Sequence, residues 1–297
     1  MPRLTSGRVQ ADIAPSDRSG IRGAEMLGLL RLGVISFGTI TLAVAASDEP
    51  ELSAMDLPAL NPDIASLQQS RDLLRPRLET LLRERYNVQL LAVYTYPAQV
   101  MFCRERFTGL ADLAGRRIRV SSVGQGELIE ALGATPVVVP FAQIASAIKD
   151  RIVECAITGS LSGNALGLQA VASTMSRQAI SWGVSLFGAN ISAWHALPVE
   201  VRTQLQEGLS ALETRIWQAA ELETEDGFAC NAGLPQCIRG KPGRMVVLDT
   251  ALQDQQTRAR LLRGVVLPKW IQRCGEECVT VWNRYMAAAR GITAAAK

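Results

Sequence analysis

Apolar positions recur with the period of an α-helix across residues 63–86, where leucine and isoleucine can share one face. This pattern predicts an amphipathic helix packed against a core. Pro76 lies inside the stretch and is expected to kink the helix or divide it in two, because proline cannot donate the backbone hydrogen bond of a helix interior. A second long helix is predicted from residue 198 to about 225, since Pro198 followed by Glu200 is a typical start signal.

The middle of the chain alternates between short apolar runs and amphipathic runs. Extended segments are predicted at residues 88–93, 100–103, 117–120, 136–139, 152–157 and 180–187, and helices at 108–115, 124–132, 142–149 and 161–171. In the central block at 117–171, apolar strands alternate with helices, which favours a parallel α/β sheet buried on both faces. Near the C-terminus the pattern predicts a strand at 245–248 and helices at about 250–272 and 276–290.

Residues 24–46 form an apolar stretch that is long enough to raise the question of a membrane span. Glu25 and Arg31 lie inside it, and charges within a span are costly. Gly33 and the β-branched pair that follows it interrupt the helical pattern. We therefore favour a helix at 24–32, a buried strand at 34–37 and another helix, with a membrane anchor as the alternative. The first 20 residues are polar and do not resemble a signal peptide.

Length and composition narrow the class of protein. A chain of 297 residues predicts about two domains, and 48% hydrophobic with 20% charged residues is ordinary globular usage. Lys and Arg total 31 against 28 Asp and Glu, so the net charge of +3 lacks the basic excess typical of nucleic-acid binders. The single histidine, His195, excludes a His-rich metal site within one chain and has no nucleophile motif to join, so we expect a surface residue.

A strand that runs into a glycine-containing turn and a helix occupies residues 117–126. It resembles the beginning of a dinucleotide-binding fingerprint, but Ile129 stands at the third glycine and the next strand ends without an acidic residue. A nicotinamide or flavin site is therefore disfavoured. The backbone N–H groups of such a turn still favour an anion, and Arg119 ends the strand beside it. Arg119 either binds a carboxylate or pairs with a structural acid.

Small polar residues follow another predicted strand at residues 158–164. The carboxyl ends of strands are where open α/β sheets bind ligands, so Thr158 is either a ligand contact or part of an ordinary hydroxyl-capped turn. Leu161 stands where a nucleophile elbow needs serine. Tyr96 and Trp182 lie at segment boundaries, which makes them candidates for the lining of a cleft, although such aromatic residues usually belong to the core.

Six cysteines are present, and none of their spacings is the Cys-x-x-Cys of zinc or thioredoxin-like sites. The pairs close in sequence are Cys230–Cys237 and Cys274–Cys278, which leaves Cys103–Cys155 on separate predicted strands. Six cysteines allow 15 pairings in general, and six free thiols remain a further alternative.

Several ordered blocks resemble one known family. They include GLADLAGRRIRV at 109–120, LIEALGATPVVVPF at 128–141, RIVE at 151–154 and ALPVEV at 196–201, with weaker matches at 7–9 and 33–38. Together they are similar to the solute receptors of tripartite ATP-independent periplasmic (TRAP) transporters, which typically read DLKGKKIRV and LGATPVPMPFSEVYTALQTGVVDG. The resemblance covers essentially the whole chain.

The resemblance implies a two-lobed periplasmic-binding-protein-like α/β fold with hinge strands and a long connecting helix. Lobe I would comprise residues 1–96 and about 186–226, and lobe II residues 97–185 and about 227–297. The family's ligand-clamping arginine falls on Arg119, whose fork matches a carboxylate. The loop residue that is often Asn aligns with Thr158. A second arginine used by some members aligns near Ala98, so the resemblance does not imply a two-arginine clamp.

Further pocket residues implied by the resemblance are Gln99, Tyr96, Thr39 and Trp182. It also implies a periplasmic protein with disulfides that binds a small organic acid without cofactor, metal or catalytic residues and delivers it to membrane permease subunits. Two alternatives stand beside it. One is an α/β enzyme, either an oxidoreductase or an acyl-transfer enzyme, and the other is a degenerate receptor that acts as a non-transport ligand-sensing module.

Family members begin with a signal peptide, a first strand and a first helix, whereas this chain begins almost at the block at 7–9. We therefore expect lobe I to lack that strand and helix, which would leave an unpaired sheet edge. A version of the protein extended upstream is expected to melt at a higher temperature.

Overall fold

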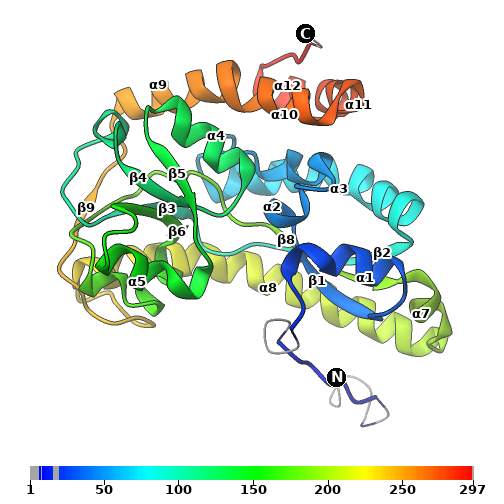
Figure 1. Ribbon diagram of the computed structural model, residues 1–297. Coiled ribbons are helices and arrows are strands. Elements are labelled where there is room, and N and C mark those ends of the chain that lie inside the picture. The colour runs from blue at the N-terminus through cyan, green and yellow to red at the C-terminus, as the bar shows by residue number, and fades with distance from the viewer. Residues whose placement is uncertain (1–6, 8, 16–19, 296–297) are drawn as a thin grey trace.

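The computed structural model describes residues 7, 9–15 and 20–295. Its described strands form two sheets that lie side by side (Figure 1). The smaller sheet has the order β1-β8-β2, with every pair antiparallel. Its strands are β1 (Phe37–Thr41), β2 (Val88–Tyr94) and β8 (Ser185–Asn190).

The larger sheet has the order β5-β4-β6-β3-β7-β9. Its strands are β3 (Gln99–Cys103), β4 (Arg117–Val120), β5 (Thr135–Val138), β6 (Cys155–Gly159), β7 (Thr174–Ser176) and β9 (Val246–Leu248). The prediction of a parallel sheet holds for β4 with β5 and β6 and for β7 with β9. Strand β3 lies outside the central block for which a parallel sheet was predicted, and it is antiparallel to β6 and β7. A short link joins β3 to β2 of the other sheet, so no crossover helix imposes a parallel direction on it.

The long predicted helices are confirmed. They are α3 (Ile64–Tyr86) and α8 (Val199–Ala232). Pro76 neither ends nor divides α3, contrary to one of the two expected outcomes, and buried leucines before and after it hold both halves on the core. Helix α8 extends beyond the predicted end near residue 225.

The other helices are shorter. They are α1 (Met26–Arg31), α2 (Leu42–Ala45), α4 (Val123–Ala131), α5 (Ile144–Lys149), α6 (Ser160–Ala165), α7 (Ile191–Ala196), α9 (Leu252–Leu261), α10 (Leu267–Cys274), α11 (Glu276–Val281) and α12 (Ala287–Arg290). The prediction of a helix at 108–115 is wrong, because only a 3-10 turn, Leu110–Leu113, forms there. Within the predicted helix at 161–171, α6 ends before a separate 3-10 turn, Leu168–Ala170.

The apolar stretch at 24–46 folds as α1, β1 and α2 rather than as one element. The strand begins at Phe37, so the expected strand at 34–37 is wrong. Gly33, with φ of 70°, ends the helical turn, and Val34 is 69% exposed. Within the described part of the chain, no helix combines the length and the apolar character needed to cross a membrane.

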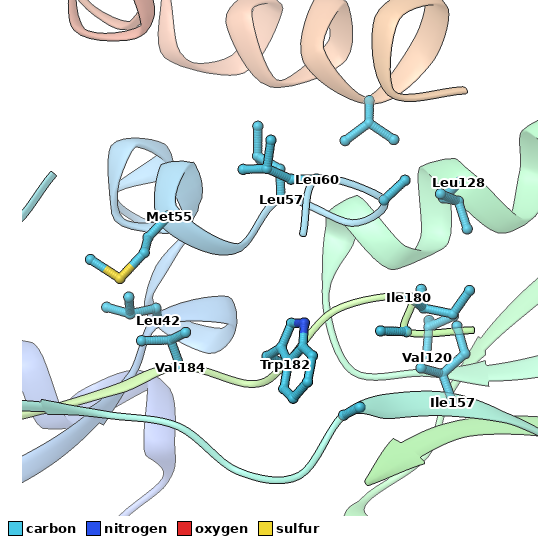
Figure 2. Packing of buried hydrophobic residues seen from close by; sticks show 14 of the residues in the cluster. Leu42, Met55, Leu57, Leu60, Val120, Leu128, Ile157, Ile180, Trp182 and Val184 are labelled. Carbon is cyan, nitrogen blue, oxygen red and sulfur yellow. The ribbon is translucent and has the colours of Figure 1, made fainter. Parts of the chain in front are cut away.

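One buried apolar cluster runs from the smaller sheet to the larger one. Figure 2 shows Trp182 between side chains that include Met55 and Val184 on one side and Val120 and Ile157 on the other. Helix α8 passes along both sheets, and α9 to α12 lie on the opposite side over α3 and α4 (Figure 1). The two sheets therefore share a core as well as a long helix.

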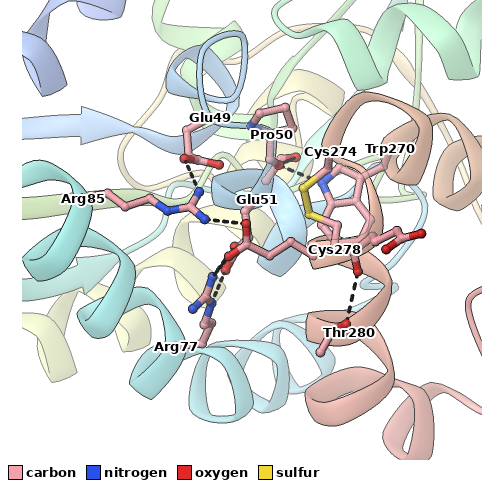
Figure 3. The surroundings of a disulfide bond; sticks show 12 residues. Glu49, Pro50, Glu51, Arg77, Arg85, Trp270, Cys274, Cys278 and Thr280 are labelled. Atoms are coloured by element: carbon pink, nitrogen blue, oxygen red, sulfur yellow. Dashed lines mark hydrogen bonds and ion pairs between the residues drawn. A yellow bond between two sulfur atoms is a disulfide. The ribbon is translucent and has the colours of Figure 1, made fainter. Parts of the chain in front are cut away.

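All three expected cysteine pairs are disulfides in the structure. Cys103 and Cys155 face each other across β3 and β6, and Cys230–Cys237 ties the end of α8 to the loop that follows. Cys274–Cys278 joins α10 to α11 (Figure 3). Beside it, Arg77 of α3 binds both Glu51 and Glu277, which attaches α11 to α3.

Candidate functional site

One edge of the larger sheet gathers three of the predicted site residues. Strands β4 and β6 are parallel, so their carboxyl ends lie at the same edge, and the antiparallel β3 begins there. Arg119 lies near the end of β4, Thr158 near the end of β6, and Gln99 starts β3 opposite Gly159. The strand positions that suggested Arg119 and Thr158 from the sequence thus bring them close to Gln99.

Arg119 is enclosed, with 5% of its surface exposed. Its Nε donates to the Val139 carbonyl at 3.0 Å and its Nη1 to the Ile157 carbonyl at 2.7 Å. Within the described residues no carboxylate pairs with Arg119. The structure therefore does not support the alternative in which this arginine pairs with a structural acid. Burial lowers the pKa of this guanidinium to about 10, which leaves it protonated at neutral pH. A buried cation without a counter-ion can accept an anionic ligand.

The turn after β4 already uses some of its donors. Ser122 caps α4 by accepting from the Gln125 N–H, and the Ser121 N–H donates to Gln125 Oε1 at 2.9 Å. Gln125 Nε2 in turn donates to Ser181 Oγ at 3.0 Å. Gln125, which was not among the candidates from the sequence, is 2% exposed and ties this turn to residue 181.

Two segments link the sheets next to this edge, at residues 95–98 and 177–184. Gln99 N–H donates to the Ser181 carbonyl at 2.8 Å, and Ile180 N–H donates to the Gln99 carbonyl at 2.8 Å. A Cβ placed on Gly183 would lie 3.4 Å from Gln99 Nε2 and 3.7 Å from the Tyr96 ring. Tyr96, Gln99 and Gly183 are therefore neighbours, and Tyr96 is 43% exposed.

Thr39 and Trp182 occupy different surroundings. Thr39, on β1 of the smaller sheet, accepts from Tyr94 Oη at 2.9 Å, and the Tyr94 ring meets that of Tyr96 edge to face. Burial raises the pKa of Tyr94 to about 12, so it remains a donor. Trp182 is 4% exposed, and its Nε1 donates to the Asn61 carbonyl. Its indole therefore belongs to the core between the sheets.

Asp56 is a second residue that the sequence analysis missed. Its carboxylate accepts the N–H groups of Trp182 and Gly183. Burial raises its pKa to about 7, while these N–H groups act in the opposite direction. An acidic residue inside the apolar run at 52–60 is the signal that could have indicated a partly buried carboxylate in need of donors.

Other candidates for chemistry lie apart from this edge. His195 is exposed on α7 and has no hydrogen-bond or ion-pair partner among the described residues. Asp226 lies beside Cys230 and Cys237, but both sulfurs are joined in a disulfide and cannot act as thiolate ligands. A hollow of about 450 Å³ between α8 and the following loop contains none of the predicted site residues.

Comparison with known proteins gives a family match. Residues 2–228 match the profile of the bacterial extracellular solute-binding proteins, family 7. A search of curated proteins found no match.

Solved structures with the same fold include three solute receptors. A Bordetella pertussis extracytoplasmic receptor that binds pyroglutamic acid has a TM-score of 0.84 at 18% identity, over 96% of this chain and 90% of that one. A Desulfovibrio salexigens TRAP receptor with bound orotic acid has a TM-score of 0.82 at 18% identity, over 96% and 89%. A Rhodoferax ferrireducens TRAP receptor with bound malonate has a TM-score of 0.80 at 19% identity, over 94% and 86%.

Proposed function

The chain belongs to family 7 of the bacterial extracellular solute-binding proteins, and from that premise we propose that it captures a small organic carboxylate and delivers it to the membrane subunits of a TRAP-type transporter. Capture takes place outside the cytoplasm, in the periplasm. Because this is a family of transport proteins, the enzyme alternatives, oxidoreductase and acyl transfer, are wrong for this chain.

The single observation that carries the proposal is the environment of Arg119. Its guanidinium is enclosed, it stays charged at neutral pH, and its described hydrogen bonds all go to backbone carbonyls. A ligand carboxylate would supply the missing counter-charge through charge-assisted hydrogen bonds. Thr158, Gln99 and Tyr96 are the proposed neighbours of that ligand, and Thr39 is an outer contact. Trp182 contributes through its backbone, because its indole lies in the core.

We assign the smaller sheet to lobe I and the larger sheet to lobe II, with the division of the chain at 1–96 plus about 186–226 and 97–185 plus about 227–297. Residues 1–6, 8, 16–19, 296 and 297 of these ranges, with Arg8 of the block at 7–9, lie outside the described residues. A ligand held between the lobes favours the closed form, because that form makes more contacts with it.

The test is isothermal titration calorimetry with pyroglutamate, malonate and orotate as probes, first on the wild type and then on Arg119→Ala. Loss of the buried charge-assisted bonds is expected to weaken binding by about 100-fold or more. Arg116→Ala is the matched control. Arg116 is in the turn just before β4 and also bonds to two backbone carbonyls, those of Glu105 and Arg106, away from the proposed site.

Unchanged affinity in a folded Arg119→Ala variant would remove Arg119 from the binding site. If none of the three probes binds the wild type, a thermal-shift screen of organic acids follows. A screen without any shift would favour a degenerate receptor that acts only as an interaction module over a transport receptor.

A further inference from the structure

The segment at 177–184 is held from two sides. Gln99 pairs with it on one side through residues 180 and 181. On the other side lies the loop at 56–61, where the Ala59 N–H donates to the Ile180 carbonyl at 2.8 Å and the Asn61 carbonyl accepts from Trp182 Nε1 at 3.1 Å. The backbone of this segment is therefore positioned by the loop as well as by β3.

Asp56 supplies the acceptors for the next two residues of the segment. The Gly183 N–H donates to Asp56 Oδ2 at 2.8 Å, and the Trp182 N–H donates to Oδ2 at 2.9 Å and to Oδ1 at 3.0 Å. Within the described residues these amides have no other acceptor. Gly183 has φ of +78°, a conformation that favours glycine, and it adjoins Tyr96 and Gln99. Asp56 thus fixes the orientation of the peptide groups next to the proposed pocket.

The charge of Asp56 is balanced by backbone amides rather than by a cation. No ion pair to it is found in the described part of the chain. The charged groups on the elements packed around its loop have other partners: Arg258 of α9 donates to the Ala59 carbonyl, Arg290 of α12 donates to Asn61 Oδ1, and Asp63 caps α3. The Val184 N–H and the Asn61 side chain also favour its ionised form. Titration of Asp56 would therefore act on the amides at 182–184, first on those of Trp182 and Gly183, which lie within 3.0 Å of its carboxylate oxygens.

We propose that Asp56 is a positioning residue for ligand capture, whose ionised form holds the Trp182–Gly183 wall of the pocket and whose protonated form releases it. Protonation turns one carboxylate oxygen into a donor, which leaves fewer acceptor sites for the two amides. Ligand affinity therefore falls on acidification. The effect on ligand affinity rests on the proposed function. The hold of Asp56 on the two amides does not.

Burial raises the pKa of Asp56 to about 7. The exchange between its ionised and protonated forms, and with it the fall in ligand affinity, is therefore expected near neutral pH. A ligand carboxylate titrates well below this range, so the ligand itself keeps its charge over the pH values of the test.

The first test needs no ligand. Hydrogen exchange at the amides of Trp182 and Gly183 is measured by NMR at about pH 5.5, 6.5 and 8, with rates corrected for the intrinsic pH dependence. In the wild type, protection is expected to fall by about 10-fold between pH 8 and 5.5 as the acceptor is protonated. In Asp56→Asn, protection is expected to be low at every pH.

Asp226→Asn is the matched control. Asp226 also accepts two consecutive amides of a distant segment, those of Ile238 and Arg239, and is 6% exposed. This variant is expected to lose protection at 238 and 239 and to retain it at 182 and 183. Equal protection of 182 and 183 in wild type and Asp56→Asn would overturn the inference. If Asp56→Asn does not fold, the pH series of the wild type decides by itself.

The second test uses calorimetry with pyroglutamate at the same pH values. The wild type is expected to bind about 10-fold more weakly at pH 5.5 than at pH 8, and Asp56→Asn to bind weakly without this dependence. Equal affinity and equal pH profiles would refute the positioning role while leaving the proposed function intact. Failure of the wild type to bind any organic acid would count against the proposed function, and the exchange measurement would still decide the role of Asp56.

Discussion

Arginines 117 and 119 lie on β4 two positions apart, and they have different environments. Arg117 is exposed and pairs with Glu154. Arg119 is enclosed, and among the described residues its side chain bonds only to the carbonyls of Val139 and Ile157. The alternation of a strand places both side chains on the same face. The difference therefore arises from what covers each position, and enclosure without a counter-ion is what makes Arg119 the stronger candidate for binding an anion.

Asp56 also predicts a pH dependence of stability. Its folded-state pKa of about 7 lies above the ordinary value of 3.8, so between these values the folded protein binds more protons than the unfolded chain. The free energy of unfolding should therefore decrease as the pH rises from about 4 to 7, by a few kcal/mol at most. Asp56→Asn should lack this contribution.

Urea unfolding of both proteins at about pH 4.5 and 7.5 measures the effect. Parallel pH profiles for wild type and variant would contradict it. The expected stability rises on acidification while the expected ligand affinity falls, so the two measurements separate global unfolding from loss of the pocket wall.

At the scale of elements, the spacing of apolar residues predicted best the helices and strands in which one period continues through the whole element. Strand β4 and helix α3 appeared close to their predicted bounds because their apolar residues repeat with a single period. Strand β7 was not predicted, because three residues with two hydroxyls among them carry no pattern. The direction of β3 depends on its link to the other sheet, which local sequence does not encode.

The candidate site was predictable only in part, for a similar reason. Arg119 and Thr158 follow from their positions at strand ends. Asp56 accepts a hydrogen bond from Trp182, 126 positions away, and Gln125 donates one to Ser181, 56 positions away. Such contacts depend on the assembled fold rather than on spacing along the chain.

The crossing of α6 and α8 predicts a strong effect at Gly227. A Cβ there would lie 2.3 Å from the Leu161 nitrogen and 2.5 Å from the Ser160 carbonyl carbon, both backbone atoms. Gly227→Ala is therefore expected to lower the free energy of unfolding by about 1–3 kcal/mol or more. Because α6 begins two residues after Thr158, Gly227→Ala should also weaken ligand binding.

Gly264→Ala is the matched control, since Gly264 is helical and a Cβ there meets nothing within 4 Å. That change is expected to be neutral or slightly stabilising. Chemical denaturation of the two variants measures the difference. A Gly227→Ala protein as stable as the wild type would show that the helices separate there at little cost.

At the scale of the whole molecule, the C-terminal helices attach to both sides of the core. Arg273 and Lys269 of α10 pair with Glu127 and Glu130 of α4. On the other side, Arg77 and Arg85 of α3 pair with Glu277 of α11. Any movement between the sheets must therefore be accommodated by α8 and by these helices together.

Closure on a ligand predicts a change in overall size. A compact chain of this length has a radius of gyration of roughly 19 Å, and small-angle X-ray scattering should show a decrease when a bound organic acid saturates the wild type. Arg119→Ala at the same ligand concentration should show no decrease. A wild type that binds ligand without any change in radius would argue for a rigid receptor.

The position of Trp182 has a practical consequence. Of the five tryptophans, it is the one on a segment that links the two sheets, and its indole Nε1 is hydrogen-bonded to the loop that also carries Asp56. Indole emission depends on the polarity and hydrogen bonding around the ring. The protein thus contains an intrinsic fluorophore where the two sheets meet, and the difference in emission between wild type and Trp182→Phe is expected to follow the proposed closure in real time without an added dye.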